Sequence, residues 1–108
     1  MTPALTPRLA LHYLRELSTD VRAGVVLGAD GSLLAGSAAL AGPARDLLAA
    51  AGDGVDEIAV ELGPGAVYAV RSPRHAVVVA LGPLALPALA LHDLRVVVAD
   101  LAGGQDSA

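Results

Sequence analysis

The feature that most constrains the fold of this 108-residue chain is an Asp-Gly pair between two apolar runs. Residues 21–27 and 33–37 are mostly apolar, and Asp30-Gly31 lies between them. Asp-Gly is the strongest short signal for a two-residue type I′ turn joining antiparallel strands. Pairing Ala29 with Ser32 then divides the side chains between two faces. One face carries Ala23, Val25, Leu27, Leu34 and Gly36, and the other carries Gly24, Val26, Gly28, Leu33 and Ala35. Because neither face is polar, we expect the hairpin to be covered on both sides.

Three further strands are predicted between residues 55 and 81. Residues 55–62 alternate cleanly, so Ile58, Val60 and Leu62 share one face and residues 57, 59 and 61 the other. Gly63-Pro64-Gly65 predicts a turn. If Leu62 then pairs with Ala66, Glu57 lies opposite Arg71 as a cross-strand ion pair. Residues 76–81 are apolar on both faces, which is typical of a central strand.

Helices are predicted before, between and after these strands. Thr6-Pro7 supplies a capping hydroxyl and a first-turn proline for a helix over residues 7–18. Gly42-Pro43 and Gly52 bound a second helix over 43–51. A third helix follows the prolines at 83 and 87 and ends near residue 101, and residues 103–108 form a disordered tail. The domain therefore spans residues 1–102.

The last helix carries a polar stripe with two apolar interruptions. The polar residues are His92, Asp93, Arg95 and Asp100. Leu89 and Val96 fall within the same stripe when residues are placed 100° apart. Two interpretations are open: these side chains pack on the first helix, or they are exposed for a partner.

Composition excludes several classes of function. The chain has net charge −4 and no basic stripe, which argues against nucleic-acid binding. It has no cysteine, which excludes disulfides, thiolate catalysis and cysteine-based zinc sites. The three histidines lack the i, i+4 spacing of a metal site on a helix, and the acidic run 53–61 lacks the ligand pattern of a calcium-binding loop. No serine lies in the nucleophile-elbow motif of a hydrolase. We therefore expect that the protein is not an enzyme and binds no metal or cofactor.

No membrane segment is predicted. The longest uncharged stretch, residues 76–91, is interrupted by Gly82, Pro83 and Pro87 and is shorter than the roughly 20 apolar residues of a spanning helix. The first residues lack the apolar core of a signal peptide. We expect a soluble, cytoplasmic protein without membrane insertion.

The predicted element order is helix, two strands, helix, three strands, helix, which favours an α+β domain on one antiparallel sheet. Over residues 7–102 this order resembles the roadblock/LC7 family. Residues 21–37, VRAGVVLGADGSLLAGS, are similar to the family's first hairpin, and residues 67–81, VYAVRSPRHAVVVAL, to its last. The resemblance implies a five-stranded antiparallel sheet of order 2-1-5-4-3 with helices on both faces, shared in outline with profilin-like and longin-like domains.

The resemblance also implies a function. Such domains are non-catalytic platforms. They form a dimer with a ten-stranded sheet, in which the third strands pair and the second helices pack against each other. Bacterial members often regulate a small Ras-like GTPase. It therefore implies a homodimeric adaptor that binds such a GTPase and modulates its nucleotide cycle or localisation. The implied dimer residues are Leu47, Leu48, Ile58, Ala59, Val60 and Leu62. The candidate partner-binding residues are Arg45, Asp46, Leu89 and Val96.

Charge on the third strand complicates a symmetric dimer. Antiparallel pairing centred on Ala59 sets Glu57 against Glu61 of the second chain, a destabilising match. We therefore expect a shifted register, or a partner whose edge is more basic. Two other functions stay open: a profilin-like or PAS-like small-ligand sensor, for which no convergent polar group is evident, and a structural subunit of a larger complex.

Overall fold

A single antiparallel sheet carries all five strands of the computed structural model, which describes residues 6–17, 20–52, 54–63, 65–83 and 86–106. The elements are α1 (Pro7–Leu17), β1 (Val21–Gly28), β2 (Leu33–Gly36), α2 (Ala38–Ala51), β3 (Glu57–Leu62), β4 (Gly65–Arg71), β5 (His75–Leu81) and α3 (Pro87–Asp106). The strand order is β2-β1-β5-β4-β3, with every neighbouring pair antiparallel. The α+β fold and the 2-1-5-4-3 order implied by the resemblance are confirmed.

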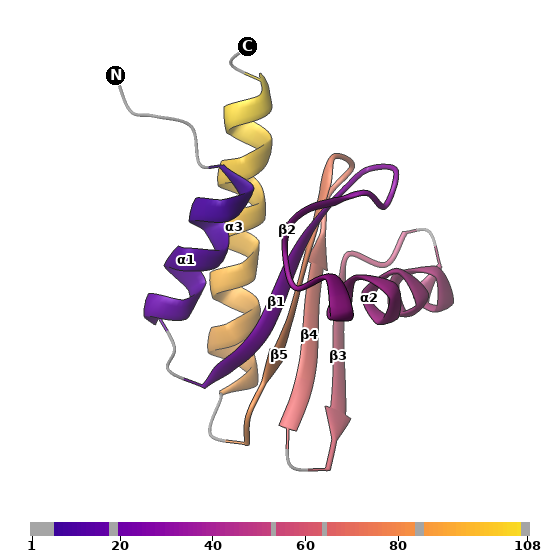
Figure 1. The fold of residues 1–108 in the computed structure, drawn as a ribbon, viewed down its shortest axis with the longest axis vertical. Helices are drawn as coiled ribbons and strands as arrows, with labels where there is room; N and C mark the ends of the chain where they lie inside the picture. Colours follow the sequence, from indigo (N-terminus) through magenta and orange to yellow (C-terminus); the bar gives the residue numbers. More distant parts are fainter. Residues whose placement is uncertain (1–5, 18–19, 53, 64, 84–85, 107–108) are drawn as a thin grey trace.

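Helices cover both faces of the sheet (Figure 1). One apolar cluster joins α1 and α3 to the side chains of Val26, Val77 and Val79. The other joins α2 to Val25 and Val78. Because β1 and β5 lie in the middle of the sheet between these two layers, both faces of each strand are buried, as the absence of polar residues predicts.

Two helices differ from their predicted limits. The α2 helix begins at Ala38, five residues earlier than predicted, with Ser37 at the N-cap and Pro43 inside it. Pro43 is the sixth residue of the helix, beyond its first turn, so it removes the backbone hydrogen bond to the Ala39 carbonyl. The alanine and leucine residues before it favour the helix nonetheless. The α3 helix continues to Asp106, because glycines 103 and 104 lower helix propensity by only about 1 kcal/mol each and do not end it.

The first hairpin turn is not the predicted type I′ turn. That type needs positive φ at both central residues, whereas in the described chain only glycines have positive φ, here Gly31 at 83°. The Gly28 N–H donates to the Ser32 carbonyl at 2.9 Å, which closes a three-residue loop, and a bulge follows in the ladder. Leu33 consequently pairs with Leu27 and packs on the α2 side, opposite to the predicted face.

The β3–β4 register is one residue away from the prediction. Leu62 pairs with Gly65 rather than Ala66, so Glu57 lies opposite Val70 and the predicted Glu57–Arg71 pair is wrong. Gly65 can start the strand because it has no side chain: an added Cβ would lie 2.5 Å from the Leu81 carbonyl oxygen. Glu57 instead forms an ion pair with Arg95 of α3, whose Nε lies 2.9 Å from the Glu57 carboxylate.

Within the part of the chain that the structure describes, no helix is long and apolar enough to cross a membrane.

Candidate functional site

The β3 strand forms one edge of the sheet, and its side chains alternate. Ile58 and Val60 are half-buried, and Ile58 packs against the α2 cluster. Glu57, Ala59 and Glu61 are exposed on the other face. The side chain of Leu62 lies outside the described part of the structure. The strand therefore presents apolar groups toward the α2 side and small or acidic groups toward the α3 side.

The backbone groups that β3 leaves open can be identified from one hydrogen bond. The Arg71 N–H donates to the Asp56 carbonyl at 2.8 Å, so residues 56 and 71 form a hydrogen-bonded pair. Such pairs alternate along an antiparallel ladder. Residues 58 and 60 therefore bond to β4, and the N–H and C=O groups of residues 57, 59 and 61 point outward. An edge of this kind is a template for a further strand.

One flank of α2 adjoins this edge. Leu40, Leu48 and Ile58 all pack against the same apolar cluster, and Leu47 is half-buried. Leu47 and Arg45 lie about 200° apart around the helix, so they occupy opposite flanks. Arg45 donates from Nε to the Gly31 carbonyl at 2.6 Å, which assigns its flank to the β1–β2 loop. The leucine flank and the β3 edge together form what we call the β3–α2 surface: Leu40, Leu47, Ile58, Ala59 and Val60.

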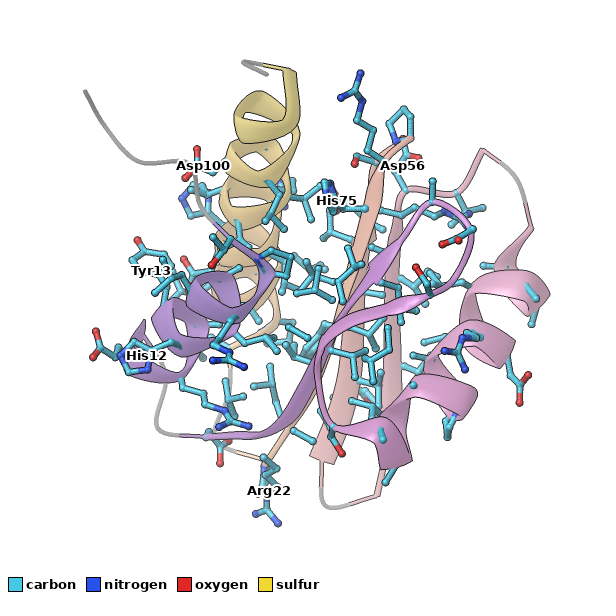
Figure 2. All side chains as sticks on the ribbon, turned by 45° about the horizontal axis from the view of Figure 1, so that its top comes forward. His12, Tyr13, Arg22, Asp56, His75 and Asp100 are labelled. Atoms are coloured by element: carbon cyan, nitrogen blue, oxygen red, sulfur yellow. The ribbon has the colours of Figure 1, made fainter. Side chains whose placement is uncertain are left out.

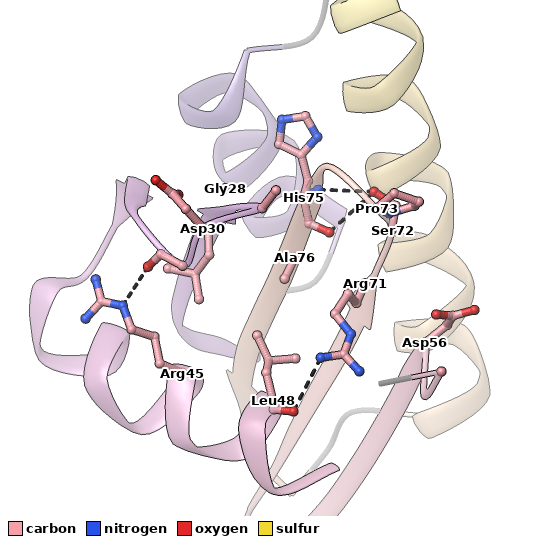
Figure 3. A pocket seen from close by; sticks show the side chains of 14 residues that line it. Gly28, Asp30, Arg45, Leu48, Asp56, Arg71, Ser72, Pro73, His75 and Ala76 are labelled. Carbon is pink, nitrogen blue, oxygen red and sulfur yellow. Dashed lines mark hydrogen bonds between the residues drawn. The ribbon is translucent and has the colours of Figure 1, made fainter. Parts of the chain in front are cut away.

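Arg71 fixes the position of α2 relative to β3, a role that sequence reasoning missed. Its guanidinium donates to the Leu48 carbonyl at 3.3 Å, as Figure 3 shows. It also donates to the carbonyls of Val55, at 2.6 Å, and Gly52. These carbonyls lie at the end of α2 and in the following loop, where few helical partners are available. The Leu48 carbonyl also accepts the Gly52 N–H at 3.3 Å. Because Leu48 and Arg71 are 23 residues apart, no local pattern reveals this contact.

A hollow of about 560 Å³ lies between α2 and the β1–β2 and β4–β5 turns (Figure 3). Arg45, Arg71 and Asp30 contribute polar groups to its lining. Arg45 and Arg71 already donate to carbonyls. Asp30 accepts from the Ser32 hydroxyl at 2.6 Å and from the Ser32 N–H, and these bonds lower the pKa of Asp30. These three groups are thus engaged with the protein itself, whereas Asp56 and His75 also line the hollow.

His75, the first residue of β5, is a buried histidine. It is 3% exposed, and its Nδ1 has no hydrogen-bond partner among the described residues. Burial lowers the pKa of His75, and the nearby Arg74 charge lowers it further. The side chain of His12, by contrast, projects from α1 and pairs with Glu16 at 3.1 Å (Figure 2).

The candidate partner-binding residues are not brought together. Arg45 and Asp46 are exposed on α2, whereas Leu89 and Val96 lie on α3, on the opposite face of the sheet. Leu89 is 57% exposed and Val96 40% exposed, so much of each side chain is open to solvent. Among the described side chains, no group of three or more potential ligands is placed to hold a metal ion.

No family model matches the sequence, and no curated protein matches it. Solved structures do share its fold. A roadblock/LC7 domain from Streptomyces avermitilis is 21% identical, with TM-score 0.66 over 82% of this chain and 91% of that one. Myxococcus xanthus MglB is 13% identical, with TM-score 0.73 over 88% and 84% of the two chains.

Acanthamoeba castellanii profilin II is also similar, at 16% identity, with TM-score 0.61 over 91% of this chain and 98% of that one. At these identities the likeness is one of fold. It confirms the roadblock/LC7 and profilin-like architecture that the sequence resemblance implied.

Proposed function

We propose that this chain is a non-catalytic dimeric adaptor that pairs with a second copy through the β3–α2 surface and regulates a small Ras-like GTPase. The observation that carries the proposal is the open β3 edge, whose apolar side continues into the leucine flank of α2. The roadblock/LC7 fold, shared with MglB, supports the same role, because the sequence resemblance implies GTPase regulation for bacterial members.

Dimerisation at β3 uses the unpaired backbone groups of the strand edge and the half-buried apolar side chains beside it. Residues 57, 59 and 61 supply outward backbone donors and acceptors. Leu47, Ile58 and Val60, which are half-buried in one chain, lose further apolar surface when a second copy covers them. Leu48 and Leu62 are included in the proposed interface with them.

A proline at residue 59 tests the edge directly. The Ala59 N–H points outward, so Ala59→Pro removes a donor that only a second chain would use. Val60→Pro is the wrong test, because the Val60 N–H bonds to β4. Loss of one donor per copy is expected to cost about 2 kcal/mol, or roughly 30-fold in the dimer Kd.

Light scattering over a concentration series gives the mass. We expect wild type and the control Ala59→Ser to reach twice 10.7 kDa. We expect Ala59→Pro to need roughly 30-fold more protein to reach that mass, with unchanged circular dichroism. A wild type that stays at 10.7 kDa at all concentrations removes the dimeric adaptor from consideration.

The GTPase is tested separately, with the small Ras-like GTPases encoded in the source genome. Each is loaded with a fluorescent guanine nucleotide and mixed with the dimer, and nucleotide release and GTP hydrolysis are followed. We expect one of them to change rate, and Arg45→Ala or Asp46→Ala to reduce the effect. Unchanged rates for all of them contradict the GTPase part of the proposal while leaving the dimer intact.

A small-ligand sensor is the second candidate, favoured by the hollow between α2 and the two turns. The polar groups of Asp30, Arg45 and Arg71 in its lining already bond within the protein, so we place the sensor below the adaptor. Mass spectrometry of the purified protein under denaturing conditions detects any small molecule that co-purifies with it. A stoichiometric ligand supports the sensor.

A further inference from the structure

We infer that Arg95 of α3 sets the register of the β3–β3 pairing, by holding Glu57 of its own chain and Glu61 of the partner subunit together. The inference rests on the proposed dimer. It adds the residue whose positive charge offsets the repulsion between Glu57 and Glu61 of the partner subunit in one of the possible registers. It starts from the ion pair between Arg95 and Glu57, which lies on the open edge of β3.

Only a few registers are available to two copies of β3. Outward-pointing residues must face outward-pointing residues across a twofold axis, because only these have free backbone groups. Residues 57, 59 and 61 therefore pair among themselves, and the axis passes through residue 58, 59 or 60. A centre at 58 or 60 joins two outward pairs, and a centre at 59 joins three.

Hydrogen bonding favours the central register. Each outward pair exchanges two N–H···O=C bonds, so a centre at Ala59 gives three times two, or six, against four for either shifted register. The same register sets Ile58 against Val60 of the partner subunit on the α2 side, an apolar match of two half-buried side chains.

Charge opposes the central register unless a cation is present. It sets Glu57 beside Glu61 of the partner subunit, with Cα atoms about 5.5 Å apart. In the isolated strand these like charges repel, which is why the sequence alone points to a shifted register. The residue that changes this conclusion comes from α3, outside the strand.

Arg95 lies where the two carboxylates would meet. Its Nε is 2.9 Å from Glu57 Oε2, and both side chains remain about half-exposed, at 51% and 41%. A guanidinium has five N–H donors, so contact through Nε leaves its terminal amino groups for a second carboxylate. The twofold axis repeats this arrangement, giving one Arg95 for each Glu57–Glu61 contact of the dimer.

Cysteine trapping reads the register directly, because the chain has no cysteine of its own. Ala59→Cys places two thiols across the axis only in the central register, at a Cα separation within disulfide range. Ile58→Cys and Val60→Cys report the two shifted registers in the same way. Under mild oxidation we expect the Ala59→Cys protein to cross-link most rapidly.

Charge variants test the role of Arg95. In sedimentation equilibrium we expect Arg95→Gln to weaken the dimer about tenfold, and Glu61→Gln in that background to restore most of the affinity, since it removes the repulsion. Arg8→Gln removes the same charge from α1 and is expected to leave the Kd unchanged. Raising the salt concentration should shrink the Arg95→Gln effect.

The outcomes separate this inference from the proposed function. A wild-type monomer overturns both. A dimer that cross-links through residue 58 or 60, or that is equally strong with Arg95→Gln, keeps the dimer and overturns the role of Arg95. A dimer trapped at residue 59 and weakened by Arg95→Gln supports both.

Discussion

Replacing Gly36 by alanine is expected to destabilise the domain strongly, although the residue lies at an exposed edge of the sheet. Gly36 has a φ of 107°, a conformation that L-residues rarely adopt. A Cβ built on it lies 2.1 Å from the Gly24 carbonyl oxygen, 2.8 Å from Val25 Cα and 2.9 Å from a Leu11 methyl. Two of these atoms are backbone of β1, so no side-chain rotation relieves the contact.

The magnitude can be assembled from three effects. Forcing a left-handed conformation on alanine costs about 1–2 kcal/mol. Moving β2 away from β1 weakens the Ser37 N–H to Gly24 carbonyl bond, now 3.1 Å, at about 1 kcal/mol. Displacing Leu11 and the cluster it joins adds about 1–2 kcal/mol. The expected loss in unfolding free energy is therefore roughly 3–5 kcal/mol, or a fall in Tm of about 12–20 °C.

Urea unfolding followed by circular dichroism measures this loss, and Gly42→Ala is the matched control. Gly42 lies inside α2, where an added Cβ meets nothing within 4 Å, so alanine there is expected to stabilise by about 0.5–1 kcal/mol. A Gly36→Ala protein within about 0.5 kcal/mol of wild type would refute the steric reasoning.

Two further predictions concern the half-buried Arg71 and the buried His75. Arg71→Met should cost about 2–4 kcal/mol in urea unfolding, because the carbonyls of Leu48, Gly52 and Val55 lose a charged donor; Arg71→Lys should recover only part, since an ammonium lacks the planar fork. The lowered pKa of His75 means that the unfolded chain binds a proton more readily than the folded one. Stability should therefore fall as the pH drops below about 6.5 toward the folded-state pKa, and His75→Met should flatten this dependence between pH 7.5 and 5. Equal slopes for wild type and His75→Met would contradict this interpretation.

The spacing of apolar residues along the sequence predicted the helices and strands, because it reflects which side chains each of them must bury. The alternation of residues 57–62 identified an edge strand, and the apolar run 76–81 a central one, and both positions are confirmed. Local capping chemistry was also readable. The Thr6 hydroxyl accepts the Leu9 N–H at 3.2 Å, and Gly52 ends α2 with a positive φ.

Errors arose where a local signal competed with packing. Gly42-Pro43 has the form of a helix start, yet the alanine-rich residues before it lie on the sheet, and Ala41 is buried there. The Gly63–Gly65 turn was misjudged by one residue. In the first hairpin the predicted pairs Val25–Gly36 and Val26–Ala35 are confirmed, and only the part next to the loop, where Leu27 pairs with Leu33, is shifted by one residue. Because side chains alternate along a strand, a shift of one residue changes which side chains face each other.

The sequence by itself determined the order of the elements, the two covered faces of the sheet and the open third strand, because these depend on hydrophobic period and turn residues along the chain. Only the tertiary structure decided the ionic contacts. Arg71 reaches the end of α2 instead of Glu57, and Glu57 pairs with Arg95, 38 positions away in the sequence. Such contacts depend on how elements pack in three dimensions, and no local spacing encodes them.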